Sequence, residues 1–299
     1  MADIKLFNIA GDVKEYEGGT VTLEKELQTV IEKNMETFFG VRFLASEYRT
    51  TDGGRMDSIG IDENHCPVIF EYKRSLNENV INQGLFYLNW LLDHKDSFKV
   101  LVIDKLGLKA SDLIDWTMPR VLCIAGDFTK FDESAIKQMN RNISLIRYKK
   151  FGNDLLMFEQ LNENIVAAIP DDVDVGPVKI KSTTKSFTEH FKDAKPQITA
   201  LYDDIRNYIV SLSDDISENQ LKLYVAFRKI KNFVCVEVYN NRIILHLRLD
   251  VGSIQYEEGF TRDTSKIGHY ATGDVEITIH DKADFEKAKP LIDRAYSEN

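Results

Sequence analysis

The chain has 299 residues, of which 43% are hydrophobic and 29% are charged, and its formal net charge is −10 at pH 7. This length suits about two globular domains, and no apolar run approaches the roughly 20 residues that a membrane-spanning helix needs. Three scattered cysteines, Cys66, Cys123 and Cys235, argue against a disulfide framework and fit a reducing compartment, so we expect a cytoplasmic protein without a membrane segment.

The first segments predict a strand-bearing lead-in, a helix and a strand. Residues 1–19 form the lead-in, with a strand near Val13 to Tyr16. Apolar residues then recur at helical spacing and predict an amphipathic helix over 22–39, which Gly40 ends. These residues are Leu23, Leu27, Val30, Ile31, Met35 and Phe38. The alternation over 43–48 predicts a strand.

The next two strands carry acids. Residues 55–61 and 68–73 both read as strands and are separated by a turn-forming cluster. Side chains alternate between the two faces of a strand, so Glu71 and Lys73 project together. If the strands form a hairpin, Asp57 comes close to Glu71. Two carboxylates and one ammonium would then meet at one end of a sheet.

Such a cluster suits metal-assisted hydrolysis. Mg²⁺ prefers oxygen ligands, usually one or two carboxylates with waters and substrate phosphate. We therefore expect Asp57 and Glu71 to hold a cation and Lys73 to act on the attacking water. The following helix, 77–92, carries Gln83 and, one turn later, Tyr87. Each of these residues alone would more often be an ordinary surface residue, and their order in the chain is what favours a site.

The rest of the first half predicts more sheet. The apolar run 99–104 is typical of a strand covered on both faces. Further strands are expected over 121–125, 143–147 and 155–160, with a helix over 134–139. Helix, antiparallel hairpin and strands alternating with helices predict an α/β core with a mixed sheet. We expect this first domain to cover residues 1–165.

The second half predicts a smaller α+β domain. Residues 166–186 contain Pro, Gly, Ser and an acidic run, and read as a linker. The accessory domain then covers 187–299. Its expected helices are 187–212 and 284–296, and its expected strands are 221–225, 232–239, 242–249 and 275–279.

The ordered motifs resemble the PD-(D/E)XK nuclease superfamily, and among its branches the RecB-like and NucS-like enzymes. The resemblance is carried by Gly54-Arg55-Met56-Asp57, Glu71-Tyr72-Lys73, and Gln83 with Tyr87. It implies a restriction-endonuclease-like mixed sheet flanked by helices. It also implies a Mg²⁺- or Mn²⁺-dependent deoxyribonuclease that cleaves DNA in repair, restriction or defence. Met56 stands where many members have proline, a departure that this branch tolerates.

The resemblance also implies roles for individual residues. Asp57, Glu71 and the main-chain carbonyl of Tyr72 would ligate the metal, Lys73 would lie near the water, and Gln83 and Tyr87 would support the site or contact DNA. A helical glutamate often assists the metal in this superfamily. Glu24 is the better match here, and Glu26 and Glu47 remain alternatives. Homodimers are common in the superfamily, although the residues themselves do not show one.

The C-terminal half resembles an uncharacterised domain found behind such nuclease-like modules, in proteins sometimes labelled predicted transport proteins. Without a membrane segment, a transporter role has little support.

The chain has no glycine-rich phosphate loop with a following Lys-Ser/Thr, which argues against an ATPase. The net charge is the main objection to DNA binding, because duplex binders usually present a basic surface. The alternative is a non-catalytic module that binds nucleic acid or another partner on a nuclease scaffold.

Overall fold

The structure is a computed structural model that describes residues 4–21, 24–74, 79–164, 185–267 and 271–299. The chain divides into two compact units, Met1–Val166 and Ala167–Asn299. Each is described below by itself. The predicted linker, 166–186, lies outside the described residues apart from its last two positions.

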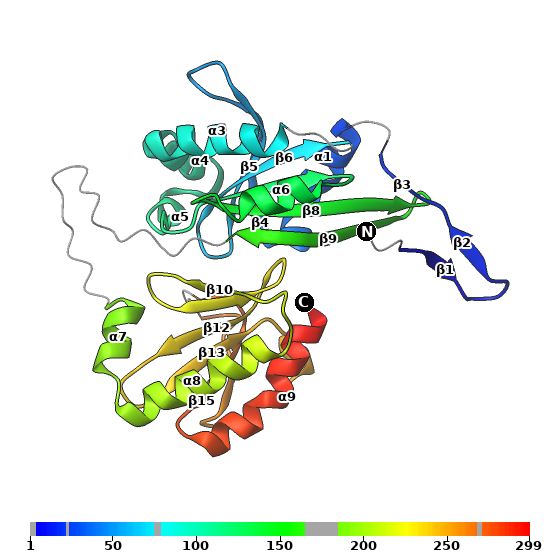
Figure 1. Cartoon of the computed structure of the whole chain (residues 1–299). Coiled ribbons are helices and arrows are strands. Elements are labelled where there is room, and N and C mark those ends of the chain that lie inside the picture. The colour runs from blue at the N-terminus through cyan, green and yellow to red at the C-terminus, as the bar shows by residue number, and fades with distance from the viewer. Residues whose placement is uncertain (1–3, 22–23, 75–78, 165–184, 268–270) are drawn as a thin grey trace. The chain divides into compact units, whose positions relative to one another are not determined.

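A mixed β-sheet forms the body of the N-terminal unit (Figure 1). Its strands follow the order β3-β8-β7-β6-β5-β4, and β9 also pairs with β8. The strands β6, β7 and β8 are parallel, whereas β4, β5 and β6 form an antiparallel meander. The predicted α/β class with a mixed sheet is therefore confirmed. The bounds are β3 Gly18–Gly19, β4 Val41–Arg49, β5 Arg55–Asp62, β6 Pro67–Lys73, β7 Arg120–Ala125, β8 Asn142–Phe151 and β9 Leu155–Asn164.

Helices cover both faces of this sheet. Because side chains alternate along a strand, Ile59 and Ile69 pack with α3 in one core, while Phe70 packs against Phe39 of α2 on the other side. Tyr72 belongs to the second face, where its hydroxyl donates to Ser58 Oγ over 3.1 Å. The helices are α1 Glu24–Lys33, α2 Met35–Phe39, α3 Val80–Asp93, α4 Lys95–Leu106, α5 Leu108–Ser111 and α6 Lys130–Ile136.

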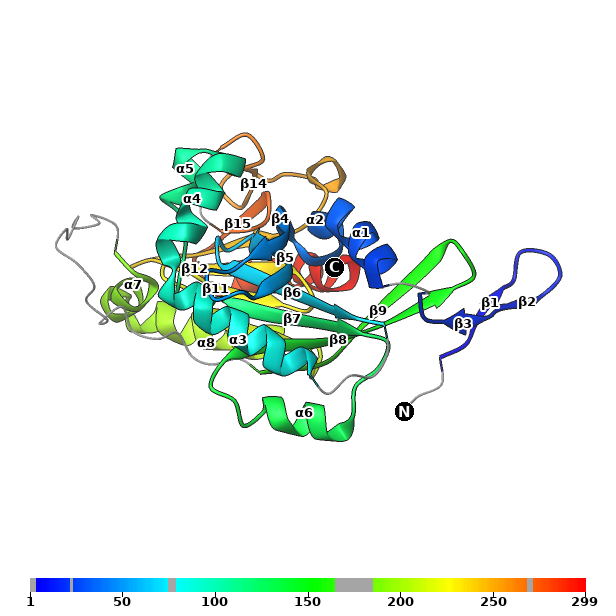
Figure 2. The same cartoon turned by 90° about the horizontal axis from the view of Figure 1, so that it is seen from above.

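Two short strands lie apart from the main sheet. Within the described part of the chain, β1 (Leu6–Asn8) and β2 (Lys14–Tyr16) pair only with each other. They lead into β3, which pairs with the end of β8. Figure 2 shows this hairpin beyond the projecting ends of β8 and β9. The predicted strand near Val13 to Tyr16 is thus present as β2.

The predicted strand over 99–104 is wrong, because these residues lie in the helix α4. The run is apolar and rich in β-branched residues, which favours a strand by local propensity. Burial instead follows a helical period, since Phe98 and Val102 are buried while Val100 is 65% exposed and Ile103 is 38% exposed. The continuous apolar run therefore marks a helix with apolar residues on its outer face.

Two predicted helices have different bounds. The helix predicted over 22–39 is divided into α1 and α2, with Asn34 between them and with residues 22–23 outside the described part. Gly40 ends α2 with a positive φ of 64°, a conformation that favours glycine. The helix predicted over 134–139 begins earlier, at Lys130, because Thr129 and Asp132 form a capping box there.

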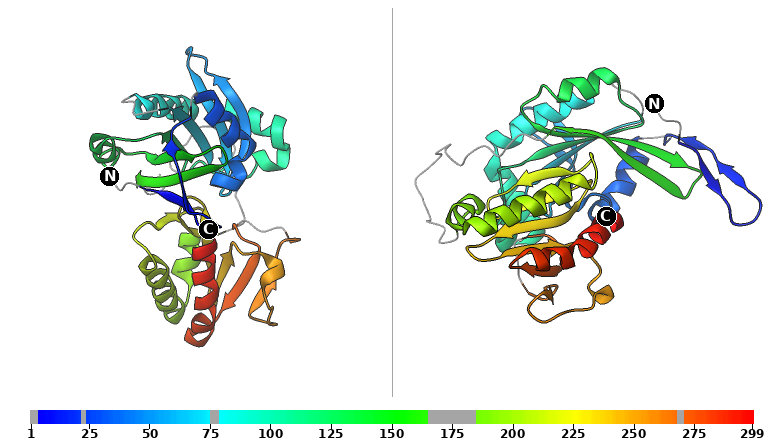
Figure 3. Two further views of the ribbon diagram at one scale, coloured as in Figure 1. Left: turned by 90° about the vertical axis from the view of Figure 1, so that its right-hand side faces the viewer. Right: turned by 60° about the horizontal axis from the view of Figure 1, so that its bottom comes forward.

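The C-terminal unit is an antiparallel sheet covered by helices on one face, as Figure 3 shows for α8 and α9. Its strand order is β10-β11-β12-β13-β15-β14. The strands are β10 Ser217–Gln220, β11 Val225–Arg228, β12 Asn232–Val238, β13 Ile243–Leu247, β14 Thr261–Asp263 and β15 Val275–Ile279. The helices are α7 Phe187–Asp193, α8 Pro196–Ser211 and α9 Lys282–Glu298, with the short 3₁₀ helix η1 at Val251–Ser253. The predicted α+β class is confirmed.

The strand predicted over 221–225 is also wrong. Residues 221–224 form the turn between β10 and β11, closed by a hydrogen bond from Leu221 N to Tyr224 O of 2.9 Å. Leu221 and Tyr224 are buried although they lie in this turn, so their apolar character resembles that of a strand. The predicted helical segment 187–212 is divided into α7 and α8. Within the described residues, no helix is long and apolar enough to cross a membrane.

Candidate active site

Asp57 and Glu71 lie next to each other on the paired strands β5 and β6. The register places Ser58 opposite Phe70, so the next residues along the hairpin face one another. The main-chain N–H of Asp57 donates to Glu71 Oε1 over 3.3 Å. The main-chain N–H of Tyr72 donates to Asp57 Oδ2 over 3.0 Å. The hairpin thus brings the two predicted carboxylates together through hydrogen bonds with the main chain.

Burial makes this pair of acids costly to ionise. Glu71 is 2% exposed, and its burial, followed by the charge of Asp57, raises the pKa of Glu71 to about 9. Burial also raises the pKa of Asp57, although the N–H of Tyr72 and the charge of Lys73 act in the opposite direction. Two neighbouring carboxylates in a low-dielectric site resist carrying two negative charges. A cation between them would relieve this repulsion.

Lys73 lies two residues after Glu71 at the end of β6 and pairs with α1. Its Nζ is 4.0 Å from Glu24 Oε2, and the Lys73 side chain is 17% exposed. Glu24 Oε1 also accepts a hydrogen bond from the main-chain N–H of Arg74 over 3.2 Å. Glu24 therefore joins the first turn of α1 to the strand that carries Glu71 and Lys73.

The other two candidate glutamates pair with other basic residues, although the charge of Glu47 also raises the pKa of Asp57. Glu26 pairs with Lys150 of β8 over 3.1 Å. Glu47 accepts a hydrogen bond from Lys25 over 3.2 Å and forms an ion pair with Arg55 over 2.7 Å, and its backbone has a positive φ of 53°. Burial alone would raise the pKa of Glu47, but the hydrogen bond and charge of Lys25 and the charge of Arg55 bring it below its ordinary value. Of the three alternatives, Glu24 is the one tied to Lys73.

A buried polar network on α1 was not predicted from the sequence. Gln28 is buried, and its amide nitrogen donates to Asp57 O over 2.8 Å and to Ser46 Oγ over 3.1 Å. It also donates to Glu32 Oε1 over 2.8 Å, and Glu32 in turn accepts from Ser58 Oγ over 2.7 Å. The signal was present, because positions 24, 28 and 32 are polar at a spacing of four residues and so lie on one helix face.

Within the described residues, Gln83 and Tyr87 of α3 make no hydrogen bond with the two acids. Gln83 is exposed, and in the described part of the chain no side-chain hydrogen bond joins it to the acids. Tyr87 is buried, and its hydroxyl accepts from the main-chain N–H of Arg55 over 3.2 Å. A Cβ added to Gly54 would lie 2.8 Å from Tyr87 Cε1, so glycine permits this approach. Tyr87 supports the main chain two residues before Asp57.

The donors partly fit a divalent cation. Nowhere in the described residues do three or more His, Cys, Asp or Glu side chains gather as a metal site. Mg²⁺ needs only one or two protein carboxylates, since waters and substrate phosphate fill the other positions. Asp57 and Glu71, both with raised pKa values, supply such a pair. The residues present thus fit a hydrated Mg²⁺ or Mn²⁺ ion better than a closed structural metal site.

A family model matches the C-terminal part of the chain, and a relative matches most of its length. Residues 187–299 match a family model described as a domain of unknown function (DUF5655). An uncharacterised protein of Haemophilus influenzae is 29% identical over 293 residues, which cover 95% of this chain and 96% of the relative. The chain is therefore similar to that protein over both units.

Among solved structures, a repair endonuclease from Pyrococcus abyssi is similar to this chain. The matched region covers 45% of this chain and 49% of the endonuclease chain. The sequence identity is 17% and the TM-score is 0.30. A likeness at this score carries no argument about activity. The case for chemistry therefore has to come from the residues around Asp57 and Glu71.

Proposed function

We propose that the N-terminal unit is a Mg²⁺- or Mn²⁺-dependent deoxyribonuclease that hydrolyses phosphodiester bonds, with DNA repair, restriction or defence as its setting. The observation that carries this proposal is the adjacent pair formed by the buried Glu71 and the half-buried Asp57. Burial raises the pKa of both carboxyl groups, and the charge of Asp57 raises the pKa of Glu71 further. Buried acids with raised pKa values and a neighbouring lysine are typical of functional sites.

The acids of the hairpin would hold the cation. Asp57 keeps its orientation because Oδ2 accepts from the Tyr72 N–H, and Glu71 keeps its orientation because Oε1 accepts from the Asp57 N–H. The second oxygen of each carboxylate and the main-chain carbonyl of Tyr72 are the proposed donors. When bound, the cation would activate a water and stabilise charge on the phosphate.

Lys73 would act on the water or on the developing negative charge. Its ammonium lies at the end of β6, on the same face of the strand as Glu71, and Glu24 holds it from α1 at 4.0 Å. A positioned ammonium favours negative charge that develops in the transition state. In this proposal Gln83 lies near the path of the DNA, and Tyr87 positions the strand that carries Asp57.

The test is a cleavage assay on the full chain. Single-stranded, duplex and branched DNA would be incubated with Mg²⁺, with Mn²⁺ or with EDTA. We expect metal-dependent cutting, which Asp57→Asn, Glu71→Gln and Lys73→Met each reduce by about a hundredfold or more, as for other losses of transition-state electrostatics. Full activity in all three folded variants would refute the site.

Glu24 and Glu26 offer a matched pair of variants. They lie two residues apart in the first turn of α1, but only Glu24 contacts Lys73. We expect Glu24→Gln to lower the cleavage rate while Glu26→Gln leaves it unchanged. The two substitutions remove the same charge from the same helix turn, so a simple helix-dipole effect would change both variants. Equal loss in both would remove Glu24 from the proposed site.

A non-catalytic binding module is the second candidate. The net charge of −10 favours it, because it weighs against tight binding of a DNA substrate. This alternative predicts that DNA or another partner binds with no turnover in Mg²⁺ or Mn²⁺. It also predicts that Glu71→Gln leaves binding unchanged. The same cleavage and binding assays therefore separate the two candidates.

A further inference from the structure

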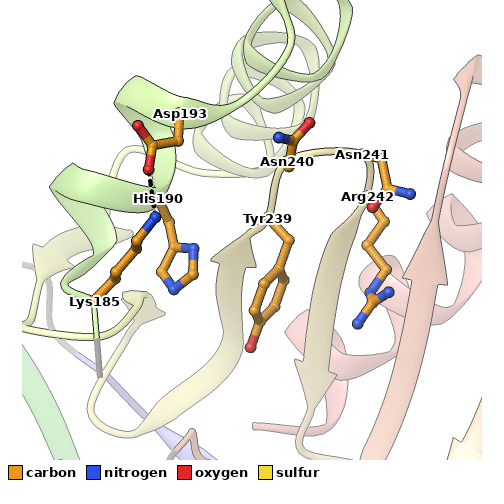
Figure 4. A pocket seen from close by; sticks show the side chains of 7 residues that line it. All are labelled: Lys185, His190, Asp193, Tyr239, Asn240, Asn241 and Arg242. Carbon is orange, nitrogen blue, oxygen red and sulfur yellow. Dashed lines mark hydrogen bonds and ion pairs between the residues drawn. The ribbon is translucent and has the colours of Figure 1, made fainter. Parts of the chain in front are cut away.

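An open pocket of about 510 Å³ lies in the C-terminal unit, between α7 and the turn that joins β12 to β13 (Figure 4). Its lining residues are Lys185, His190, Asp193, Tyr239, Asn240, Asn241 and Arg242. The volume is within the range of pockets that bind small ligands. The turn is fixed by the N-cap residue of α8, because Lys195 N donates to Asn240 O over 3.1 Å.

Aromatic rings and a guanidinium group form one wall of this pocket. The rings of His190 and Tyr239 meet edge to face, with centroids 5.0 Å apart. The guanidinium of Arg242 lies over the Tyr239 ring, 5.2 Å from its centroid. The Tyr239 hydroxyl donates to Glu237 over 2.6 Å, which fixes the ring. Burial, followed by this hydrogen bond, raises the pKa of Tyr239, so the phenol stays neutral.

The pocket carries an excess of basic groups in an acidic chain. Among the described lining residues the one carboxylate is that of Asp193, and it is already paired with Lys185 over 2.7 Å, as the dashed line in Figure 4 shows. Arg242 has no carboxylate partner among the described residues. Its planar fork of N–H donors suits a phosphate group. The side-chain amides of Asn240 and Asn241 add donors and acceptors of the kind that pair with the edge of a base.

We propose that this pocket binds a nucleoside phosphate, with the phosphate on Arg242 and the base against the rings of His190 and Tyr239. The two sources of this chemistry are a free mononucleotide and the phosphorylated end of a single strand. Base stacking on aromatic residues tolerates any sequence, whereas the phosphate contact would depend on salt. The site is independent of the proposed cleavage chemistry, because none of its residues belongs to the N-terminal unit.

Calorimetric titration of the full chain in EDTA tests this proposal, because cleavage is then silent. We expect AMP to bind about tenfold or more tightly than adenosine or inorganic phosphate, since only AMP engages both the rings and the arginine. A short oligothymidylate with and without a 5′-phosphate distinguishes the sources. Tighter binding of the phosphorylated strand than of AMP assigns a strand end, and the reverse assigns a free nucleotide.

Three variants make the test specific. Arg242→Ala should weaken AMP binding about tenfold or more, as expected for the loss of a charge-assisted hydrogen bond. Tyr239→Leu should also weaken it, whereas Lys192→Ala on the same helix α7, outside the pocket, should not. Thermal unfolding of each variant checks the fold. Absence of AMP binding at millimolar concentration, equal binding of AMP and phosphate, or unchanged binding in folded Arg242→Ala would overturn the assignment.

Discussion

Glu71→Gln should stabilise the metal-free N-terminal unit at neutral pH. The folded protein holds Glu71 with a pKa of about 9, against an ordinary value of 4.5. Below pH 4.5 the Glu71 carboxyl group is protonated in both the folded and the unfolded state, so it does not change the free energy of unfolding. Above that pH Glu71 ionises in the unfolded chain but stays protonated in the folded protein. The free energy of unfolding therefore falls until the pH passes about 9.

The size of the effect follows from the shift. Each pH unit between the two pKa values costs about 1.4 kcal/mol, so the penalty reaches about 3 kcal/mol at pH 7. Asp57 and Glu71 titrate as a coupled pair, so this free energy belongs to the pair and not to one residue. A glutamine at position 71 keeps an oxygen that accepts from the Asp57 N–H and removes the charge. Residues that serve catalysis often lower stability in this way.

Tryptophan fluorescence offers a selective assay. The only two tryptophans in the sequence, Trp90 and Trp116, lie in the N-terminal unit. Urea unfolding in EDTA would be followed at several pH values between 5 and 8. We expect the wild-type free energy of unfolding to fall as the pH rises, and the advantage of Glu71→Gln to grow in parallel. Added Mg²⁺ or Mn²⁺ should stabilise the wild type more than the variant.

The control is Glu26→Gln, which removes a more exposed acid of the same unit. Its pH dependence should match that of the wild type. If Glu71→Gln also gives the same pH profile as the wild type, then Glu71 ionises normally in the folded protein. In that case, burial and the charge of Asp57 would not raise the pKa of Glu71.

Two further predictions concern the support of the site. Gln28→Ala should destabilise the N-terminal unit by about 1–3 kcal/mol, because it leaves Asp57 O without its buried donor; urea unfolding measures this, and a smaller loss would mean that water replaces the amide. Gly54→Ala should cost about 1–3 kcal/mol, because the new Cβ would meet Thr50 Oγ1 at 2.7 Å and Tyr87 Cε1 at 2.8 Å. Gly54→Ala should cost less in a Tyr87→Leu background than in the wild type, and an equal cost in both backgrounds would exclude the contact with Tyr87 as the cause.

Local patterns were enough to predict the hairpin that carries the acids. The period-two alternation over 68–73 and the turn residues before it depend only on neighbouring residues. These patterns fixed which side chains share a face, and the ladder between β5 and β6 then had to bring Asp57 beside Glu71. The mixed sheet followed in the same way from the order of its strands and helices.

The apolar run at 99–104 was misread for a physical reason. Its local propensity favours a strand, and only packing against the sheet selects the helix, with Phe98 and Val102 inward. Similarly, Leu221 and Tyr224 are buried although they lie in a turn. In these segments packing against the rest of the protein outweighed the local secondary-structure propensity. That packing cannot be predicted from the residues of the segment alone.

The sequence by itself determined most of the helices and strands and the hairpin on which Asp57 and Glu71 lie, because periodicity and turn chemistry are local properties. Only the tertiary structure decided that Glu24 pairs with Lys73 while Glu26 pairs with Lys150. It also decided that the Gln28 amide donates to the main-chain carbonyl of Asp57. It alone also assembled the pocket of the C-terminal unit, from a helix and a turn nearly fifty residues apart in the chain. Such choices depend on distances between segments that fold together, and burial then sets how strongly each charge is felt.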